Sequence, residues 1–228
     1  MASNENPVKI TLDELRERFL KMPTTVVSDA LDAIGITENA VTGIRPVWKC
    51  PAIFGTALTV RNVPASTHTQ KNHGGFVTAQ YAKPGDIIVV DNGGDEENNG
   101  WGELVAWAAR MKGVVGTVVD GAVRDVDAFE KMGYPVYSKA ITLRTARKRM
   151  VQDGININIR FRSTQVRPGD YIMADINGIC VIPPDKVMEV LEKAESIQAK
   201  EDAMIEEIKK GENALNVQEK SGYEKMLR

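Results

Sequence analysis

Apolar residues recur at helical spacing in two stretches near the start of the chain. The first covers residues 12–19, where Thr11 followed three residues later by Glu14 predicts a capping box. The second begins near residue 24 and runs to Gly35, and glycine commonly ends a helix. We therefore expect two short helices before the first strand.

Strand patterns follow, and one of them is repeated. Residues 52–63 alternate in the manner of a strand, and residues 84–91 pass from a Pro-Gly turn into a buried apolar run. The same Pro-Gly-Asp entry returns at residues 167–175 and leads through a turn into another apolar run, within 177–184. The repeat indicates either two related strand entries in one β-rich core or two copies of a common turn.

The middle of the chain predicts alternating helices and strands. In order, the pattern predicts a helix over 103–112, a strand over 114–119, a turn at Asp120 and Gly121, a helix over 126–132 and a strand over 134–137. One apolar stripe of the first of these helices has the i, i+3, i+4, i+7 spacing of a buried face. We expect core packing for its members, Leu104, Trp107, Ala108 and Met111.

One long helix is predicted over residues 185–210, because most of its residues are strong helix formers. Gly211 would end it, and the polar tail after it predicts a short helix or no regular structure. The long helix would cover its own sheet or contact a neighbouring subunit, and we favour the subunit contact. We divide the chain into a catalytic core over 1–184 and a C-terminal helical extension over 185–228.

Composition narrows the class of protein. The chain has 228 residues with a net charge of -2, which argues against a nucleic-acid partner. No apolar run approaches the roughly 20 residues that span a bilayer, and the polar start of the chain shows no secretory signal. Cys50 and Cys180 lie far apart and are expected to be reduced core residues. We expect a cytoplasmic protein with no membrane association.

An arginine and three acids are the candidate chemical groups. Asp125 is the expected metal ligand, because a carboxylate suits Mg²⁺, which keeps several of its waters. Glu103 and Asp120 are candidates for an outer shell around that ion. Arg124 suits a substrate carboxylate, since its planar fork binds one with two parallel hydrogen bonds. The alternatives are a solvated turn with a surface ion pair, or a structural bridge from Arg124 to Glu103 or Asp127.

The start of the helix at 103 offers a second anion site. The amides of Leu104 and Val105 lie in its first turn, where unpaired N–H groups favour an anion. Gly102 before them would let a ligand approach the backbone closely. The alternative is that Asn98 or Asn99 caps this helix.

Several familiar motifs are absent. His68 and His73 are five positions apart, which is not the spacing of a helical metal pair, and they are expected in a polar loop. No Ser-His-acid arrangement, Walker loop or zinc motif is present. No G-x-G-x-x-G follows a strand, which also disfavours a methyltransferase with a nucleotide-type site.

Glycines and charged residues between positions 102 and 125 resemble the signature of the RraA-like family. The likeness covers most of the chain, from residues 27–31 to Asp175 and Gly178. In the aldolase branch of that family an acid lies twenty-one positions before the arginine; Glu103 fills this position, where Asp is usual. The branch that regulates ribonuclease E typically has glycine there. The residues that carry the signature are Gly102, Glu103, Gly113, Gly116, Asp120, Gly121, Arg124 and Asp125.

The resemblance implies an α/β protein with the layered α/β/β/α arrangement of the swivelling β/β/α type, a single domain with a long C-terminal helix. Trimers or hexamers would be the usual assembly, with sites between subunits. Asp125 would carry Mg²⁺ or Mn²⁺, with Glu103 near it, and Arg124 would bind the substrate. The Leu104 and Val105 amides, after Gly102, would receive the pyruvyl carboxylate. An acid from a neighbour's C-terminal region would complete the site, with Glu201 as its counterpart.

The implied activity is that of a divalent-metal-dependent lyase that cleaves a carbon–carbon bond of a 2-oxo acid. Candidate substrates are 4-hydroxy-4-methyl-2-oxoglutarate, 4-carboxy-4-hydroxy-2-oxoadipate and oxaloacetate. Cleavage would leave a pyruvate enolate, and Arg124, Glu103 and Asp120 are the expected catalytic residues. The alternative is a non-catalytic regulator that binds a ribonuclease. The acid at Glu103 favours the enzyme.

Overall fold

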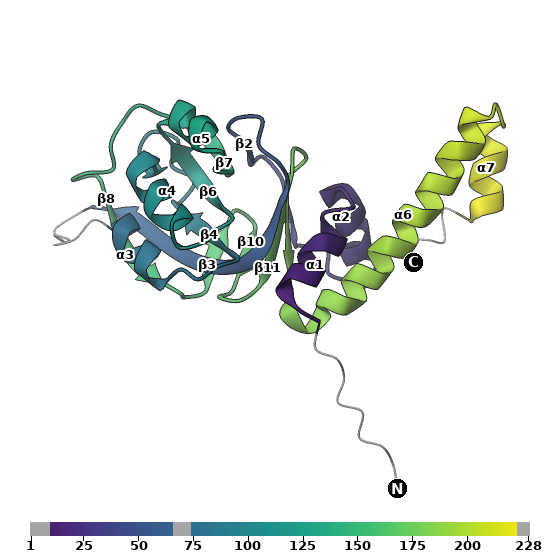
Figure 1. The fold of residues 1–228 in the computed structure, drawn as a ribbon, viewed down its shortest axis with the longest axis horizontal. Coiled ribbons are helices and arrows are strands. Elements are labelled where there is room, and N and C mark those ends of the chain that lie inside the picture. Colours follow the sequence, from purple (N-terminus) through teal and green to yellow (C-terminus); the bar gives the residue numbers. More distant parts are fainter. Residues whose placement is uncertain (1–9, 66–73, 223–228) are drawn as a thin grey trace, which may run out of the picture.

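The computed structural model describes residues 10–65 and 74–222, and within them ten strands form one mixed sheet (Figure 1). Its main path runs β1-β12-β11-β3-β4-β6-β7-β2, with β5 added beside β6 and β8 beside β3. A separate pair, β9 and β10, forms a hairpin. The strands are β1 (Ala40–Val41), β2 (Arg45–Pro46), β3 (Ile53–Pro64), β4 (Asp86–Asp91), β5 (Asn99–Trp101), β6 (Gly116–Val123), β7 (Val136–Ile141), β8 (Met150–Ile155), β9 (Ile159–Phe161), β10 (Thr164–Val166), β11 (Tyr171–Ala174) and β12 (Ile179–Ile182).

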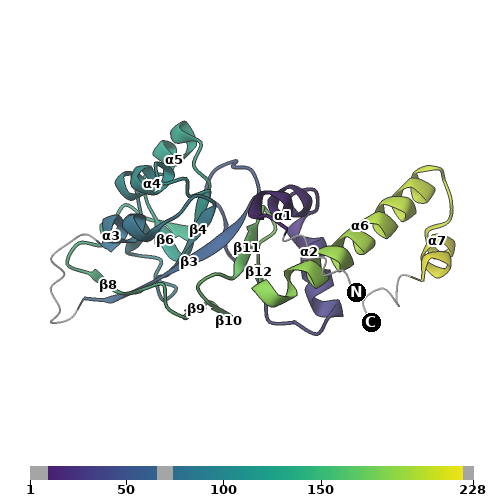
Figure 2. The ribbon, with the colours of Figure 1, turned by 60° about the horizontal axis from the view of Figure 1, so that its bottom comes forward.

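The helices form two groups: α4 and α5 pack on the parallel strands, and α1, α2 and α6 pack on β11, β12 and the start of β3. They are α1 (Leu12–Phe19), α2 (Thr24–Ala33), α3 (Gly74–Tyr81), α4 (Glu103–Arg110), α5 (Val126–Met132), α6 (Val187–Lys209) and α7 (Ala214–Ser221), with a 3-10 turn η1 (Pro184–Lys186) before α6. Figure 2 shows α3, α4 and α5 on one side of β3, β4 and β6, and the β9–β10 hairpin on the other. Among the described residues, no helix is both long enough and apolar enough to cross a membrane.

Strands β3, β4, β6 and β7 run parallel, and this parallel part positions the candidate site. The carboxyl ends of parallel strands meet at one edge of a sheet, so the loops after them gather there. The β11 side of β3 is antiparallel, and β12 and β1 continue it. The result is a layered α/β fold with a long C-terminal helix, as the sequence predicts.

The repeated Pro-Gly-Asp phrase enters the strands on either side of β3, namely β4 and β11. The two turns are built alike: Asp86 accepts a hydrogen bond from the Lys83 amide and Asp170 one from the Arg167 amide, both at 2.8 Å. The glycine of each turn has a φ of +89°, a left-handed conformation that favours glycine. Both copies of the phrase therefore enter strands of one sheet through turns of the same geometry.

Three clusters of buried side chains hold the layers together. One joins α1, α2 and α6 to β11, β12 and the start of β3. A second lies between α4, α5 and the parallel strands. The third lies on the opposite face of those strands, under the β9–β10 hairpin. Cys180, with a free thiol, is buried in the first cluster, and Cys50, also free, packs against the third.

Most predicted helices form where the pattern places them. The capping box at α1 is present, with the Glu14 amide donating to Thr11 Oγ1 and the Thr11 amide donating to Glu14 Oε2. The long helix is α6, of 23 residues, and part of the polar tail forms α7. The sequence pattern did not predict strands β8, β9 and β10, which follow β7 and precede β11 along the chain. The division between a core over 1–184 and an extension over 185–228 stays a prediction.

The predicted buried face of α4 is wrong. Leu104, Trp107 and Met111 are exposed by 68%, 44% and 78%, whereas Val105, Ala106 and Ala109 are buried. Both stripes are apolar, so periodicity alone does not decide between them. The buried stripe is the one with two alanines, whose small side chains let the helix approach the sheet closely.

The predicted turn at Asp120 and Gly121 is also wrong, because β6 continues through both residues to Val123. A register shift against β7 falls between Val119 and Ala122, so the irregularity is a bulge inside the strand. The turn comes later, at Arg124 and Asp125. This extension decides which way the acids of the segment point.

Candidate active site

A cavity of about 550 Å³ lies at the carboxyl ends of β3, β4 and β6. Its walls come from the start of α3, from β5 and the start of α4, from the loop after β6, and from the segment that leads into β8. The residues that line it include Trp101, Gly102, Glu103, Leu104, Val105, Arg124, Asp125, Arg147 and Lys148.

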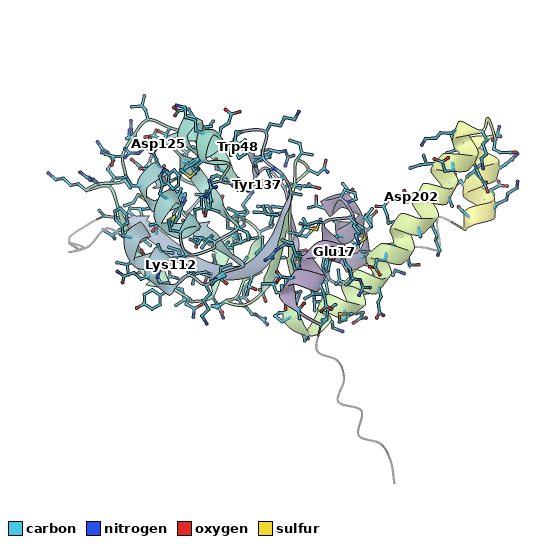
Figure 3. All side chains as sticks on the ribbon, in the orientation of Figure 1. Glu17, Trp48, Lys112, Asp125, Tyr137 and Asp202 are labelled. Carbon is cyan, nitrogen blue, oxygen red and sulfur yellow. The ribbon has the colours of Figure 1, made fainter. Side chains whose placement is uncertain are left out.

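Asp125 joins the end of β6 to the start of α5 with an unusual backbone. Its φ of 66° and ψ of 40° place it in the left-handed region, which is uncommon for residues other than glycine and is often found at functional sites. Its Oδ2 accepts a hydrogen bond of 3.0 Å from the Glu103 amide, across the cavity wall. The carboxylate is therefore fixed against the first turn of α4. Figure 3 labels Asp125 on the side of the molecule away from α6.

Gly102 is the N-cap residue of α4 and has no side chain to cap the helix. A Cβ at this position would lie 2.9 Å from Asp125 Oδ2 and 3.5 Å from Arg124 Nε. Glycine therefore leaves room for the Asp125 carboxylate, which caps the helix from the loop after β6. The alternative of a cap by Asn98 or Asn99 is not found, and Asn99 Oδ1 accepts a bond from the Ala146 amide.

Arg124 lies beside Asp125, with Nε 3.4 Å from Oδ2. Neither alternative partner holds it in the described structure: Asp127 pairs with Lys131 at 3.0 Å, and Glu103 forms no ion pair with it. Nε of Arg124 is buried and has no hydrogen-bond acceptor among the described residues. The guanidinium thus has bonding capacity left for a ligand.

The first turn of α4 supplies further donors. Within the described part of the chain, the amides of Leu104 and Val105 have no hydrogen-bond acceptor, because the first intrahelical bond runs from the Ala106 amide to Gly102 O. Trp101, in the wall before them, also has a buried indole nitrogen without an acceptor in that part of the chain. Amides at a helix N-terminus favour an anion.

Among the described residues that line the cavity, Glu103 and Asp125 are the two with carboxylates. Across residues 10–65 and 74–222, no group of three or more histidines, cysteines or acids is placed to hold a metal ion. Two carboxylates fit Mg²⁺, which is commonly held by one or two carboxylates and keeps several waters, and they do not fit a closed protein cage. The donor set of the cavity is therefore compatible with a hydrated divalent cation.

The structure does not bring Asp120 to this cavity. Its neighbour Val119 packs on the α4 side of the sheet, so Asp120, one residue on in the strand, points to the opposite face. There its Oδ2 accepts a bond of 3.1 Å from the Arg162 amide in the β9–β10 turn. Burial raises the pKa of Asp91 on the adjacent strand, and the carboxylate of Asp120 adds to that rise.

The two histidines and Glu201, which the sequence analysis also considered, are not placed in this cavity. His68 and His73 lie outside the described residues. Glu201 lies on α6, packed near Asp29 of α2 in its own chain, where burial and then that acid raise its pKa. Its neighbour Asp202 is far from Asp125 in Figure 3, so Glu201 does not reach the cavity of its own chain.

The sequence analysis missed one wall of the cavity. This wall is the segment before β8, and the sequence analysis assigned it no motif. Its lining residues are Thr145, Ala146, Arg147 and Lys148. The signal was present as four basic residues within positions 144–149. It was not assigned because nothing local indicates that this loop folds back beside β5.

Comparisons with known proteins point to one family. The RraA-like family, described as Aldolase/RraA, matches residues 24–181. A putative 4-hydroxy-4-methyl-2-oxoglutarate aldolase of Halalkalibacterium halodurans is 35% identical over 187 residues, which cover 82% of this chain and 84% of that protein. Protein DlpA of Legionella pneumophila is 30% identical over 214 residues, 94% of this chain, but the chain spans only 35% of the length of DlpA.

A solved structure agrees with the fold. The crystal structure of Streptomyces coelicolor RraAS2, described as an unusual member of the RNase ES inhibitor RraA protein family, superposes with a TM-score of 0.74. It is 21% identical, and the match covers 86% of this chain and 98% of that one. At this identity the likeness concerns the fold alone.

Proposed function

Because the chain belongs to the RraA-like family of aldolases and RraA proteins, we propose that it is a divalent-metal-dependent lyase that cleaves a carbon–carbon bond of a 2-oxo acid. The reactions are aldol cleavage of the 4-hydroxy-4-methyl-2-oxoglutarate or 4-carboxy-4-hydroxy-2-oxoadipate type and decarboxylation of oxaloacetate. Each releases pyruvate. The name of the Halalkalibacterium relative supports the first of these.

One observation carries the proposal. Asp125, in a left-handed backbone conformation, caps α4 from the loop after β6 and lies beside Arg124. A carboxylate for a cation and donors for an anion are thus fixed within one cavity. Arg124 Nε is buried and has no acceptor among the described residues, although most buried polar groups have one.

In this proposal Asp125 and Glu103 hold Mg²⁺ or Mn²⁺. When bound, the cation supplies a Lewis acid that stabilises negative charge on the 2-oxo group. Arg124 binds the adjacent carboxylate with its planar fork, and the Leu104 and Val105 amides donate to the same group. These contacts orient the bond that breaks.

Glu103 is the group best placed to serve the proton transfers. In aldol cleavage the 4-hydroxyl loses its proton, the C3–C4 bond breaks, and its electron pair passes to the pyruvate enolate. The enolate then takes a proton at C3, which completes pyruvate. The exposed Glu103 carboxylate positions the water that accepts the first proton and returns the second. Asp120, on the opposite face of the sheet, takes no part.

The test is pyruvate release from 4-hydroxy-4-methyl-2-oxoglutarate and from oxaloacetate, with Mg²⁺ or Mn²⁺ and with chelator. We expect release that requires the metal and exceeds the protein-free reaction with the same metal. A non-catalytic regulator would release no pyruvate beyond that blank and would bind a ribonuclease. That result would reject the lyase.

We also propose that the protein acts as a homo-oligomer. Leu104, Trp107 and Met111 expose an apolar face beside the cavity, and Ile205, Ile208 and Leu215 expose another on α6 and α7. The two faces lie at opposite ends of the molecule, so they do not meet within one chain (Figure 1). A head-to-tail contact between copies would cover both and close a ring such as a trimer.

Sedimentation velocity tests this assembly. The unmodified protein should sediment as a trimer or hexamer, and the Trp107→Glu/Met111→Glu variant as a smaller species, because each carboxylate would be buried in the contact. Lys112→Glu, at an exposed position two residues after α4 ends, is the control that should keep the assembly. A monomeric unmodified protein would contradict the proposal.

A further inference from the structure

We propose that Asn92 is a positioning residue, which fixes the short strand β5 and through it the start of α4 and the Arg124 backbone. The Asn92 side chain is fully buried, and it contacts Asn62 and Gly100, which line the cavity. The inference rests on the proposed function, because it takes the anionic end of the substrate to be bound at the start of α4. It adds a residue that acts on this site without touching the substrate.

Strand β5 determines where two parts of the site lie. It has only three residues, and its pairing with β6 through Asn99 and Trp101 includes a register shift. Trp101 O accepts a 3.2 Å bond from the Arg124 amide, and O of the next residue, Gly102, accepts the first intrahelical bond of α4, 3.1 Å from the Ala106 amide. A displacement of β5 would therefore move the arginine and the helix start together.

The side chain of Asn92 connects β3 to the residue that precedes β5. Asn92 directly follows β4, and its Nδ2 donates to Asn98 O at 3.1 Å, while its Oδ1 accepts a 3.0 Å bond from Asn62 Nδ2. A main-chain carbonyl can only accept, so the Asn98 bond requires the amide nitrogen of Asn92 on that side. A carboxylate of the same shape could not make this bond.

Two glycines make room for the Asn92 side chain. A Cβ at Gly100, in β5, would lie 3.2 Å from Asn92 Cγ, and a Cβ at Gly121, in the bulge of β6, would lie 2.8 Å from Asn92 Cβ. The two strands whose pairing is irregular thus both pack on this one side chain. A buried polar group with both ends bonded favours a single arrangement of the segments that it joins.

Asn39 offers a matched comparison at the edge of the same sheet. Its Nδ2 donates to Val181 O at 2.8 Å, beside the pairing of β1 with β12. The bond is of the same kind as that between Asn92 and Asn98, an amide side chain donating to a main-chain carbonyl. If Asn92 served only the stability of the fold, the same substitution at the two positions would affect ligand binding alike.

Calorimetric titration of the Mg²⁺-loaded protein with pyruvate tests the positioning role. In Asn92→Asp the side chain keeps its shape, but the ionised carboxylate cannot donate to Asn98 O. At about pH 8 we expect this variant to bind pyruvate about 10- to 100-fold more weakly than the unmodified protein, as for loss of a buried hydrogen bond. Asn39→Asp should bind pyruvate as the unmodified protein does.

Lower pH should rescue Asn92→Asp. The groups that contact Asn92, from Asn62, Asn98, Gly100 and Gly121, are uncharged, so burial raises the pKa of the introduced carboxyl. The acids at positions 91 and 95 raise that pKa further. The protonated carboxyl can donate to Asn98 O, so at about pH 5.5 the affinity should return to within about 3-fold of that of the unmodified protein.

Hydrogen exchange of the metal-free protein provides a readout that needs no ligand. The amides of Ala106 and Arg124 should exchange faster in Asn92→Asp than in Asn39→Asp, because their acceptors lie in and directly after β5. If Asn92→Asp does not fold, Gly100→Ala replaces it in both measurements. Its methyl group would displace the Asn92 side chain and should weaken pyruvate binding about 10-fold at both pH values.

The outcomes separate this inference from the proposed function. Unchanged pyruvate binding by Asn92→Asp at about pH 8, or by Gly100→Ala, overturns the positioning role and leaves the lyase intact. A loss in Asn92→Asp that does not recover at low pH overturns the assignment to the Asn98 bond. Absence of pyruvate binding by the unmodified protein would contradict the proposed function, and the exchange rates would then decide whether Asn92 fixes β5.

Discussion

Asp125→Asn should lower metal-dependent pyruvate release by about 10³-fold or more, since loss of a cation that supplies several kcal/mol to the transition state has this effect. Asparagine tolerates the left-handed conformation with φ near 66°, and its side-chain oxygen can still accept the Glu103 amide. The fold should therefore persist while the negative charge is lost. Initial rates against Mg²⁺ concentration, with circular dichroism of the same sample, measure both effects.

Asp127→Asn is the matched control for Asp125→Asn. Asp127 lies two residues away, in the first turn of α5, where its carboxylate is exposed and forms an ion pair with Lys131. Such a surface pair contributes little to stability, so this variant should keep its activity. Full activity of Asp125→Asn, or an equal loss in both variants, would contradict the role of Asp125 as the metal ligand.

Arg124→Met should lower kcat/KM by about 10³-fold, the value of two charge-assisted hydrogen bonds of roughly 2 kcal/mol each. Arg124→Lys keeps the charge but loses the planar fork, so an intermediate loss of about 10- to 100-fold is expected. The ranking of the three proteins separates recognition of carboxylate geometry from simple attraction. Steady-state kinetics with oxaloacetate, corrected for its spontaneous decarboxylation, provide the comparison.

Arg18→Met controls for loss of an arginine that binds a carboxylate with two hydrogen bonds. Its guanidinium donates to both oxygens of Glu195 at 2.8 and 2.6 Å, in the α1–α6 contact far from the cavity. This variant should lose some stability and no activity per folded molecule. If Arg124→Met retained the kcat/KM of the unmodified protein, the substrate carboxylate would not be bound at Arg124.

Local patterns predicted the elements whose signals are contained within a few residues. The capping box at Thr11 and Glu14, the α5 helix between Asp125 and Gly133, and the Pro-Gly-Asp entries to β4 and β11 all form as predicted. In each case the hydrogen bonds that define the feature join residues a few positions apart. Such bonds depend little on the rest of the fold.

The same reasoning failed where the outcome depends on what packs against an element. Helix α4 is apolar on two sides, and the sheet buries the stripe of Val105, Ala106 and Ala109 and leaves Trp107 and Met111 exposed. For Asp120, an extension of β6 past the predicted turn decides the direction of the carboxylate, since successive side chains in a strand point to opposite faces.

By itself, the sequence determined the charged groups of the candidate site and their order: an acid at the start of one helix, and an arginine and an acid after the next strand. It also determined the family, because that pattern is specific. Only the tertiary structure decided that Asp125 caps α4, that Asp120 faces away, and that Arg147 and Lys148 line the cavity. Those outcomes depend on contacts between segments 22 to 47 positions apart, such as Asn99 with Ala146, which no local pattern encodes.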